Sequence, residues 1–108
     1  MLTRNVRQMR RFSAEKMVKE SVFATERLFY DVYCLQPGQA QKVHSHAGSD
    51  KVYLVLDGQA IVTLGDEEQE ISEGEAVLCP AGIAHGVRNA SETNVSLLVV
   101  TTPPPAGK

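Results

Sequence analysis

After the first twenty residues, the chain becomes a series of short apolar or alternating runs separated by turn-forming residues. None of these runs has the apolar spacing of an amphipathic helix. Strand-like runs that recur about every ten residues predict an antiparallel sandwich or barrel. The predicted strands cover residues 22–25, 28–35, 40–46, 51–56, 59–64, 75–79, 84–89 and 95–101.

Glycine and aspartate mark the turns between these runs. Asp57-Gly58 stands between the apolar runs 51–56 and 59–64 and is the strongest local hairpin signal of the chain. We therefore expect these two runs to pair as a hairpin. Helix is expected only near residues 13–19, where Ser13 is a suitable cap for a short turn.

The predicted strand that follows residue 50 is apolar on both faces. Alternation places Val52, Leu54 and Leu56 on one face. Tyr53 and Val55 lie on the other. One face lines the interior of the barrel, and the second needs a cover, which a second sheet or a self-complementary dimer interface would supply. We expect a homodimer.

Length and composition fit one ordinary globular domain. The 108 residues are 43% hydrophobic and 22% charged, with a net charge of −2, which excludes a disordered chain. No stretch approaches the ~20 apolar residues that span a bilayer, and the N-terminus lacks the apolar block of a secretory signal. We expect a cytoplasmic protein without membrane contact, in which Cys34 and Cys79 are buried free thiols.

Positive charge is concentrated near the N-terminus. Six of the eleven basic residues lie within the first twenty positions: Arg4, Arg7, Arg10, Arg11, Lys16 and Lys19. Such an arm suits nucleic acid or an anionic surface, or it is a solvated segment across the outside of the barrel. Because no aromatic interleaving accompanies the charge, we favour the solvated segment and expect no nucleic-acid partner. Residues 1–20 are thus a basic arm, 21–102 the barrel and 103–108 a proline-rich tail that cannot join a sheet.

Three histidines carry the candidate chemistry. His44 and His46 are two residues apart on a predicted strand, so both rings point to the same side. His85 follows about forty residues later, after the turn residues Pro80 and Gly82. Imidazole is a good ligand for zinc, iron, copper and nickel. By itself, however, the pair is equally compatible with ordinary core or surface histidines.

The spacing around these histidines is more specific. One set of residues is Gly38, five residues, His44-x-His46, four residues, Lys51, six residues and Gly58. The second set is Gly74, five residues, Pro80-x-Gly82, two residues, His85, three residues and Asn89, and fifteen residues separate the sets. Over residues 28–101 the chain resembles the cupin superfamily, in particular its small single-domain members. The resemblance implies an all-β, antiparallel double-stranded β-helix or jelly-roll barrel with an irregular N-terminal segment, in which the three histidines meet on one metal ion.

Lys51 departs from the cupin pattern, which has a glutamate ligand at this position. A cation there changes the local charge by about two units and costs on the order of several kcal/mol at ~4–6 Å from a divalent ion. Four arrangements remain open. The site is a three-histidine centre, which we favour; Asp50 supplies the carboxylate through a strand bulge; Lys51 turns toward the mouth and pairs with an anion; or the metal is lost and the pocket binds an acidic ligand.

The resemblance implies two kinds of function. The first is a metal-dependent dioxygenase or isomerase of a small organic acid, with Lys51 and Tyr53 as the candidate catalytic residues. Tyr53 is otherwise a core aromatic with a hydrogen-bonded hydroxyl. The second is a non-catalytic module that binds a metal or a small metabolite. The expected cofactor is a divalent metal ion, and the pattern does not distinguish Fe, Mn, Zn, Ni, Co and Cu.

Overall fold

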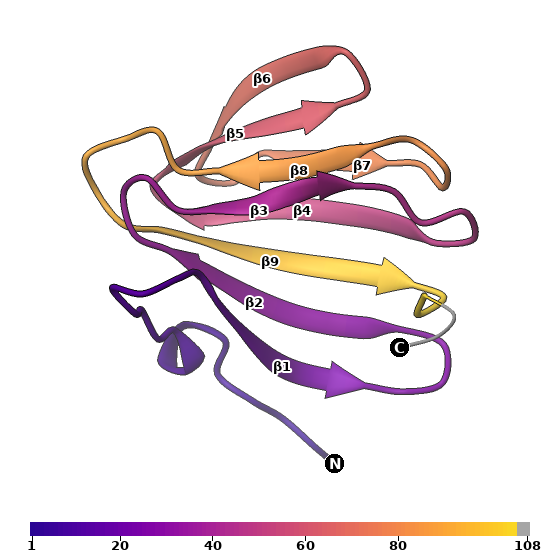
Figure 1. The fold of residues 1–108 in the computed structure, drawn as a ribbon. Coiled ribbons are helices and arrows are strands. Elements are labelled where there is room, and N and C mark those ends of the chain that lie inside the picture. The colour runs from indigo at the N-terminus through magenta and orange to yellow at the C-terminus, as the bar shows by residue number, and fades with distance from the viewer. Residues whose placement is uncertain (106–108) are drawn as a thin grey trace.

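The computed structural model describes residues 1–105, which form two antiparallel sheets packed face to face (Figure 1). One sheet has the order β1 (Val18–Ala24), β2 (Phe29–Leu35), β9 (Val95–Thr102), β4 (Asp50–Asp57), β7 (Ala76–Cys79). The other has the order β3 (Ala40–His44), β8 (His85–Arg88), β5 (Gln59–Leu64), β6 (Glu67–Ser72). A single 3-10 turn, η1 (Arg7–Met9), precedes β1. The predicted all-β double-stranded β-helix is confirmed.

The expected hairpin at Asp57-Gly58 is wrong. β4 pairs with β7 and β9, whereas β5 pairs with β6 and β8, so Asp57-Gly58 carries the chain from one sheet to the other. Gly58 has a φ of 84°. A Cβ at this position would lie 2.6 Å from the carbonyl oxygen of Asn94. Both the backbone conformation and the close contact therefore require glycine at this crossing.

A hairpin forms one turn later instead, at Gly65-Asp66, which joins β5 to β6 with Leu64 opposite Glu67. The apolar patterning predicts no strand over 67–72, because four consecutive acidic or amide residues precede Ile71. These residues are exposed on the edge of the sheet, and Ile71 alone is fully buried. Charged side chains on an edge strand oppose pairing with other chains.

The helix expected near residues 13–19 is also wrong. The Ser13 hydroxyl accepts a hydrogen bond from the amide of Glu15 at 3.2 Å, but the chain bends there and enters β1 at Val18. Val18 pairs with Cys34 of β2. Burial of Val18 and Val22 against the sheet decides for the strand, since a lone helical turn would bury neither. β1 thus begins inside the segment expected to be the basic arm.

The core lies between the two sheets, and a second apolar cluster lies under the N-terminal arm. Val6, Met9 and Phe12 of the arm pack against buried residues of β1 and β2. Arg7 and Arg10 both form ion pairs with Asp57, at 2.6 Å in the case of Arg7. The arm therefore lies across the outside of the barrel and is packed against it through these apolar residues.

The outer face of β4 is only partly covered. Val52 and Leu54 are half-buried there, opposite Leu78 and Ala76 of β7. Leu78 is 58% exposed. On the opposite face, Tyr53 belongs to the core, as alternation predicts.

The described part of the proline-rich tail is held to the barrel. The Ser49 hydroxyl donates to the carbonyl oxygen of Pro103 at 2.6 Å. Residues 106–108 of the predicted tail lie outside the described residues. Within residues 1–105, no helix is long and apolar enough to cross a membrane.

Candidate functional site

The three histidines meet at one end of the paired strands β3 and β8. His44 is the last residue of β3 and pairs with His85, the first residue of β8. His46 lies two residues beyond the end of β3 and not within it. The ring centroid of His44 lies 4.6 Å from that of His85 and 4.8 Å from that of His46, and the third separation is 6.1 Å. The structure thus brings together all three predicted ligands.

Backbone carbonyls orient two of these rings. The Nδ1 atom of His44 lies 2.7 Å from the carbonyl oxygen of Lys42, and that of His85 lies 3.0 Å from the carbonyl oxygen of Ile83. A carbonyl oxygen only accepts, so Nδ1 carries the hydrogen in both rings. In the neutral rings, Nε2 therefore has the lone pair, which is the arrangement that metal-binding histidines use.

His85 is the most deeply placed of the three. It is 1% exposed, and its Nε2 atom is buried with no hydrogen-bond partner among the described residues. Burial lowers the pKa of His85, the hydrogen bond to the carbonyl oxygen of Ile83 opposes this shift, and Lys51, His44 and His46 lower the pKa further. The ring is therefore held in its neutral form, with an unsatisfied lone pair inside the protein. A buried acceptor without a partner is costly unless a ligand completes it.

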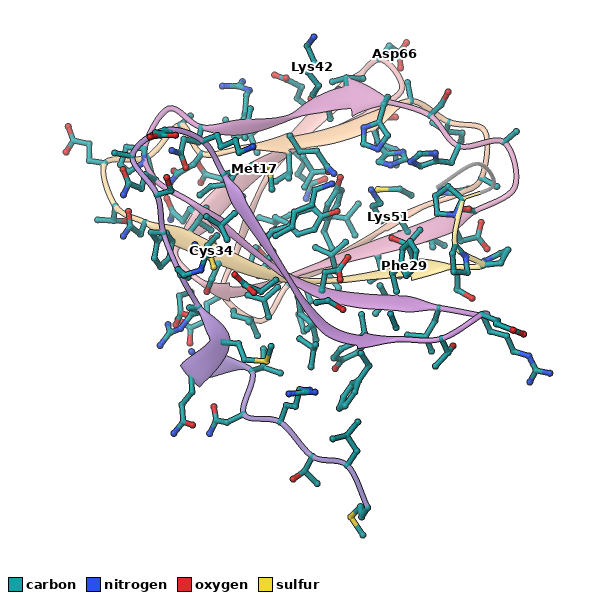
Figure 2. The ribbon with its side chains drawn as sticks, turned by 60° about the horizontal axis from the view of Figure 1, so that its bottom comes forward. Met17, Phe29, Cys34, Lys42, Lys51 and Asp66 are labelled. Atoms are coloured by element: carbon teal, nitrogen blue, oxygen red, sulfur yellow. The ribbon has the colours of Figure 1, made fainter. Side chains whose placement is uncertain are left out.

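Lys51 lies inside the same cluster. The side chain is buried, at 3% exposed, and its Nζ atom lies 3.5 Å from Nε2 of His44 and 5.8 Å from the centre of the Tyr53 ring. Since His44 presents a lone pair at Nε2, the ammonium of Lys51 is the donor in this contact. Figure 2 shows Lys51 and Phe29 in the space between the sheets. The residue that departs from the cupin motif thus contacts a predicted metal ligand directly.

A cavity of about 410 Å³ opens beside this cluster and is lined in part by His44 and His46. Its charged lining residues are Lys19, Lys42, Lys51 and Asp31. Burial raises the pKa of Asp31, while Lys19 and Lys51 oppose that shift. Three ammonium groups against one carboxylate give this cavity an excess of positive charge.

A chain of buried hydrogen bonds links Tyr33 and Gln41, which line the cavity, to Tyr53 behind it. The Tyr53 hydroxyl donates to Oε1 of Gln41 at 2.6 Å, and Nε2 of Gln41 donates to the hydroxyl oxygen of Tyr33 at 3.1 Å. Burial raises the pKa of Tyr33 to about 12 and also raises that of Tyr53. Both hydroxyls therefore stay protonated at neutral pH.

Tyr33, Gln41, Asp31 and Lys19 were not among the residues expected from the sequence. They come from β1, β2 and β3 and meet only through sheet pairing and packing. No local motif marks them. The one available signal was alternation along β2, which places Asp31 and Tyr33 on the same face.

Other sequence expectations concern single residues. The Asp50 carboxylate accepts a hydrogen bond from the amide of Ala81 at 2.9 Å and is exposed, which favours a role in holding the β7–β8 loop. Cys34 and Cys79 are buried and free, as predicted. Burial raises the pKa of both thiols, to about 11 for Cys79.

The three histidines are suitable ligands for a divalent metal, but they are not arranged as a formed metal centre. Among residues 1–105, no three His, Cys, Asp or Glu side chains are grouped as a formed metal centre. The contact of Lys51 with Nε2 of His44 gives a physical reason why no metal centre is formed among these residues. The ammonium occupies the direction in which a metal would bind. The neutral ring of His85 and its unsatisfied Nε2 atom nevertheless suit a soft or borderline cation.

Two antiparallel sheets with this strand order, packed face to face, define a double-stranded β-helix protein. The Cupin domain family matches residues 31–101, and the chain belongs to this family.

Known proteins share the fold over nearly the whole chain. The crystal structure of TT1209 from Thermus thermophilus is 50% identical, with a TM-score of 0.93 over 95% of this chain and 98% of that one. A double-stranded β-helix protein from Klebsiella pneumoniae is 23% identical, with a TM-score of 0.88 over 97% of this chain and 92% of that one, and shows the fold alone. A Streptomyces coelicolor protein, SCO3923, is 38% identical over 68% of each chain.

Proposed function

We propose that this cupin protein binds a divalent metal ion through His44, His46 and His85. The observation that carries the proposal is the state of His85: a neutral, buried ring whose Nδ1 donates to a backbone carbonyl and whose Nε2 has no partner among the described residues. His44 repeats the same orientation of Nδ1 directly across the strand pair. Such second contacts fix the ring and raise the basicity of the ligating nitrogen.

His44, His46 and His85 would hold the ion with open coordination positions, and the ion would supply Lewis-acid polarisation of an oxygen-donor ligand there. The cavity beside the histidines gives a small organic acid access to those positions. The residues that line the cavity bind and orient this acid, and the apolar core behind them excludes water. Tyr53 has a supporting role, because its hydroxyl donates to Gln41, which lines the cavity. Lys51 is then the residue placed to exchange a proton.

Whether the acid is transformed or only held separates two forms of the proposal. Turnover as a dioxygenase or isomerase is favoured by Lys51, a buried ammonium beside the histidines. A binding module is favoured because the other charged groups that the described residues place around the cavity are two lysines and a single carboxylate, Asp31. Oxygen uptake and product analysis with a panel of small carboxylates distinguish the two forms, because only the enzyme consumes its ligand.

The metal content of untagged protein tests the proposal. After separate incubation with Fe, Mn, Zn, Ni, Co or Cu and gel filtration, we expect about one ion per chain for at least one metal. His85→Ala and His44→Ala should each lower this content at least about tenfold, whereas Asp50→Asn should leave it unchanged. Circular dichroism checks that each variant is folded. Less than about a tenth of an ion per chain, with no change in the histidine variants, would refute the metal site.

The proposal extends to the assembly and location of the protein, which we take to be a cytoplasmic homodimer. Leu78, Val52 and Val100 lie in register across β7, β4 and β9 and form an apolar row on the outer face of the sheet. The N-terminal arm packs on the part of this face near β1 and β2, and Leu78 at the other end remains largely exposed. A second copy supplies the cover that this row lacks.

A further inference from the structure

The directions of the hydrogen bonds among Tyr53, Gln41 and Tyr33 decide which tyrosine hydroxyl can donate to a ligand in the cavity. Tyr53 and Gln41 are 2.6 Å apart, a distance typical of O–H···O, and Gln41 and Tyr33 are 3.1 Å apart, which suits N–H···O. The Gln41 amide therefore points its oxygen at Tyr53 and its nitrogen at Tyr33. Because Tyr33 accepts from this amide, its own hydrogen is left to donate elsewhere.

Tyr33 lines the cavity, whereas Tyr53 lies behind it. The Tyr33 hydroxyl is thus placed to donate its one hydrogen to a group bound in the cavity. Lys51 lines the same space with a buried ammonium. A hydroxyl donor and an ammonium donor that converge on one cavity suit an anion with two oxygen atoms, because charge-assisted hydrogen bonds are the strongest that such groups form.

The remaining lining residues limit the kind of anion. Lys19 and Lys42 add positive charge, and Asp31 is the one carboxylate in the described lining. Phe29 adds an apolar surface. A cavity of about 410 Å³ admits a small organic molecule, with its apolar part against Phe29.

We propose that Lys51 and Tyr33 bind the carboxylate of a small organic acid, and that Gln41 and Tyr53 are positioning residues that aim the Tyr33 hydroxyl at it. This inference rests on the proposed function only for the location of the site. It assigns carboxylate recognition to residues of this chain, independently of whether a metal is bound. Lys51 then has a role that explains a cation at the position where the cupin motif carries a glutamate.

Calorimetric titrations of the full chain with malonate and benzoate, and with their neutral analogues malonamide and benzamide, test the proposal. Each titration is made on chelator-treated and on metal-loaded protein, whose metal content is measured on the same sample. We expect the chelator-treated protein to bind at least one carboxylate about tenfold or more tightly than its amide. Equal binding of acid and amide would overturn the proposal.

Variants assign the recognition to residues. Lys51→Met should weaken carboxylate binding by about tenfold or more, and Tyr33→Phe by about three- to tenfold. Lys16→Met and Tyr30→Phe, which remove a like charge and a like hydroxyl outside the cavity, should leave binding unchanged. The inference fails if the acid binds only to metal-loaded protein and if Lys51→Met and Tyr33→Phe bind it as tightly as the unmodified protein does. The metal alone would then hold the acid.

A double-mutant cycle isolates the positioning role. Tyr53→Phe removes the donor that fixes the Gln41 amide, and it should weaken malonate or benzoate binding without changing that of the amide. If Tyr53 acts through the Tyr33 hydroxyl, Tyr53→Phe has no further effect in a Tyr33→Phe background. Additive losses would contradict the relay. Inorganic phosphate that competes with higher affinity than either carboxylate would overturn the assignment of the ligand class.

Loss of metal content in the histidine variants with retained acid selectivity supports both proposals. Selective acid binding by a protein that takes up no metal refutes the proposed metal site and leaves the present inference standing. The two can thus fail separately.

Discussion

At the scale of single residues, Lys51 decides how the site behaves. Its ammonium lies 3.5 Å from the His44 nitrogen that the proposed metal would use, so a metal would compete with the lysine for the same lone pair. Metal binding therefore requires Lys51 to move away from His44, which a bound acid favours by offering the ammonium a carboxylate. If the proposed metal and acid both bind, each would support the binding of the other, and by linkage each would raise the affinity for the other by the same factor.

Replacing Lys51 by glutamate tests this competition. Lys51→Glu removes the competing ammonium and adds a carboxylate near His44, so we expect metal affinity to rise by about tenfold or more. Competition with a chromogenic chelator measures this affinity. Lys16→Glu makes the same charge change at an exposed position and is expected to have little effect. An unchanged or lower affinity in Lys51→Glu would show that Lys51 does not occupy the ligand position.

The limits of prediction from sequence are clear for these residues. His44, His46 and His85 were found because their spacing carries a family motif. Tyr33 and Gln41 were missed because their role comes from hydrogen bonds among three strands, which no spacing records. The sequence marks Lys51 as anomalous, but its contact with His44 depends on the packing of the two sheets, because β4 and β3 belong to different sheets.

At the scale of elements, local patterns predict which residues form strands better than they predict which strands pair with one another. The runs 28–35, 75–79 and 95–101 match β2, β7 and β9 within a residue or two. Asp57-Gly58 has the composition of a hairpin turn, yet β4 and β5 belong to different sheets, since burial of both apolar faces outweighs the local turn preference. β6 was missed because an edge strand is stabilised by its backbone pairing and needs little apolar patterning.

The crossing at Asp57 also anchors the N-terminal arm. Burial alone would raise the pKa of Asp57, but hydrogen bonds from Ser96 and Arg7 and the charge of Arg10 together lower it. A lowered pKa in the folded state means that this carboxylate stabilises the fold fully above its usual pKa. The contribution is lost as the pH falls through the lowered value.

Asp57→Asn should therefore destabilise the protein by about 1 kcal/mol at pH 7, because two partly exposed ion pairs are lost. The difference from the unmodified chain should shrink as the pH falls through the lowered pKa of Asp57, because both side chains are then uncharged. Urea unfolding across this pH range measures the difference. Faster trypsin cleavage within the arm would accompany the loss of stability.

Glu68→Gln, which removes the exposed Arg88–Glu68 pair on the other sheet, serves as the control. A difference that persists at low pH would show that charge is not the cause.

At the scale of the whole molecule, the two sheets have unequal surroundings. Their inner faces share one core that is closed at the histidine end by the cavity wall. The arm covers only part of the outer face of the larger sheet, and this unevenness follows from the chain order, because the arm is continuous with β1 at the edge far from β7. The exposed end of the sheet is thus where a second copy would dock.

Leu78→Glu tests that arrangement. Leu78 is 58% exposed in the single chain, so glutamate should change the stability of a monomer by only about 0.5 kcal/mol. In a dimer that buries this position, two carboxylates would be desolvated against apolar surface, and the dimer should dissociate. Light scattering after gel filtration should give twice the chain mass for the unmodified protein and a single chain mass for Leu78→Glu. Val43→Glu places the same charge at a residue that is 54% exposed on the other sheet and should leave the dimer intact. Dissociation by Val43→Glu instead would place the interface on the sheet that carries His44, and a single chain mass for the unmodified protein would refute the dimer.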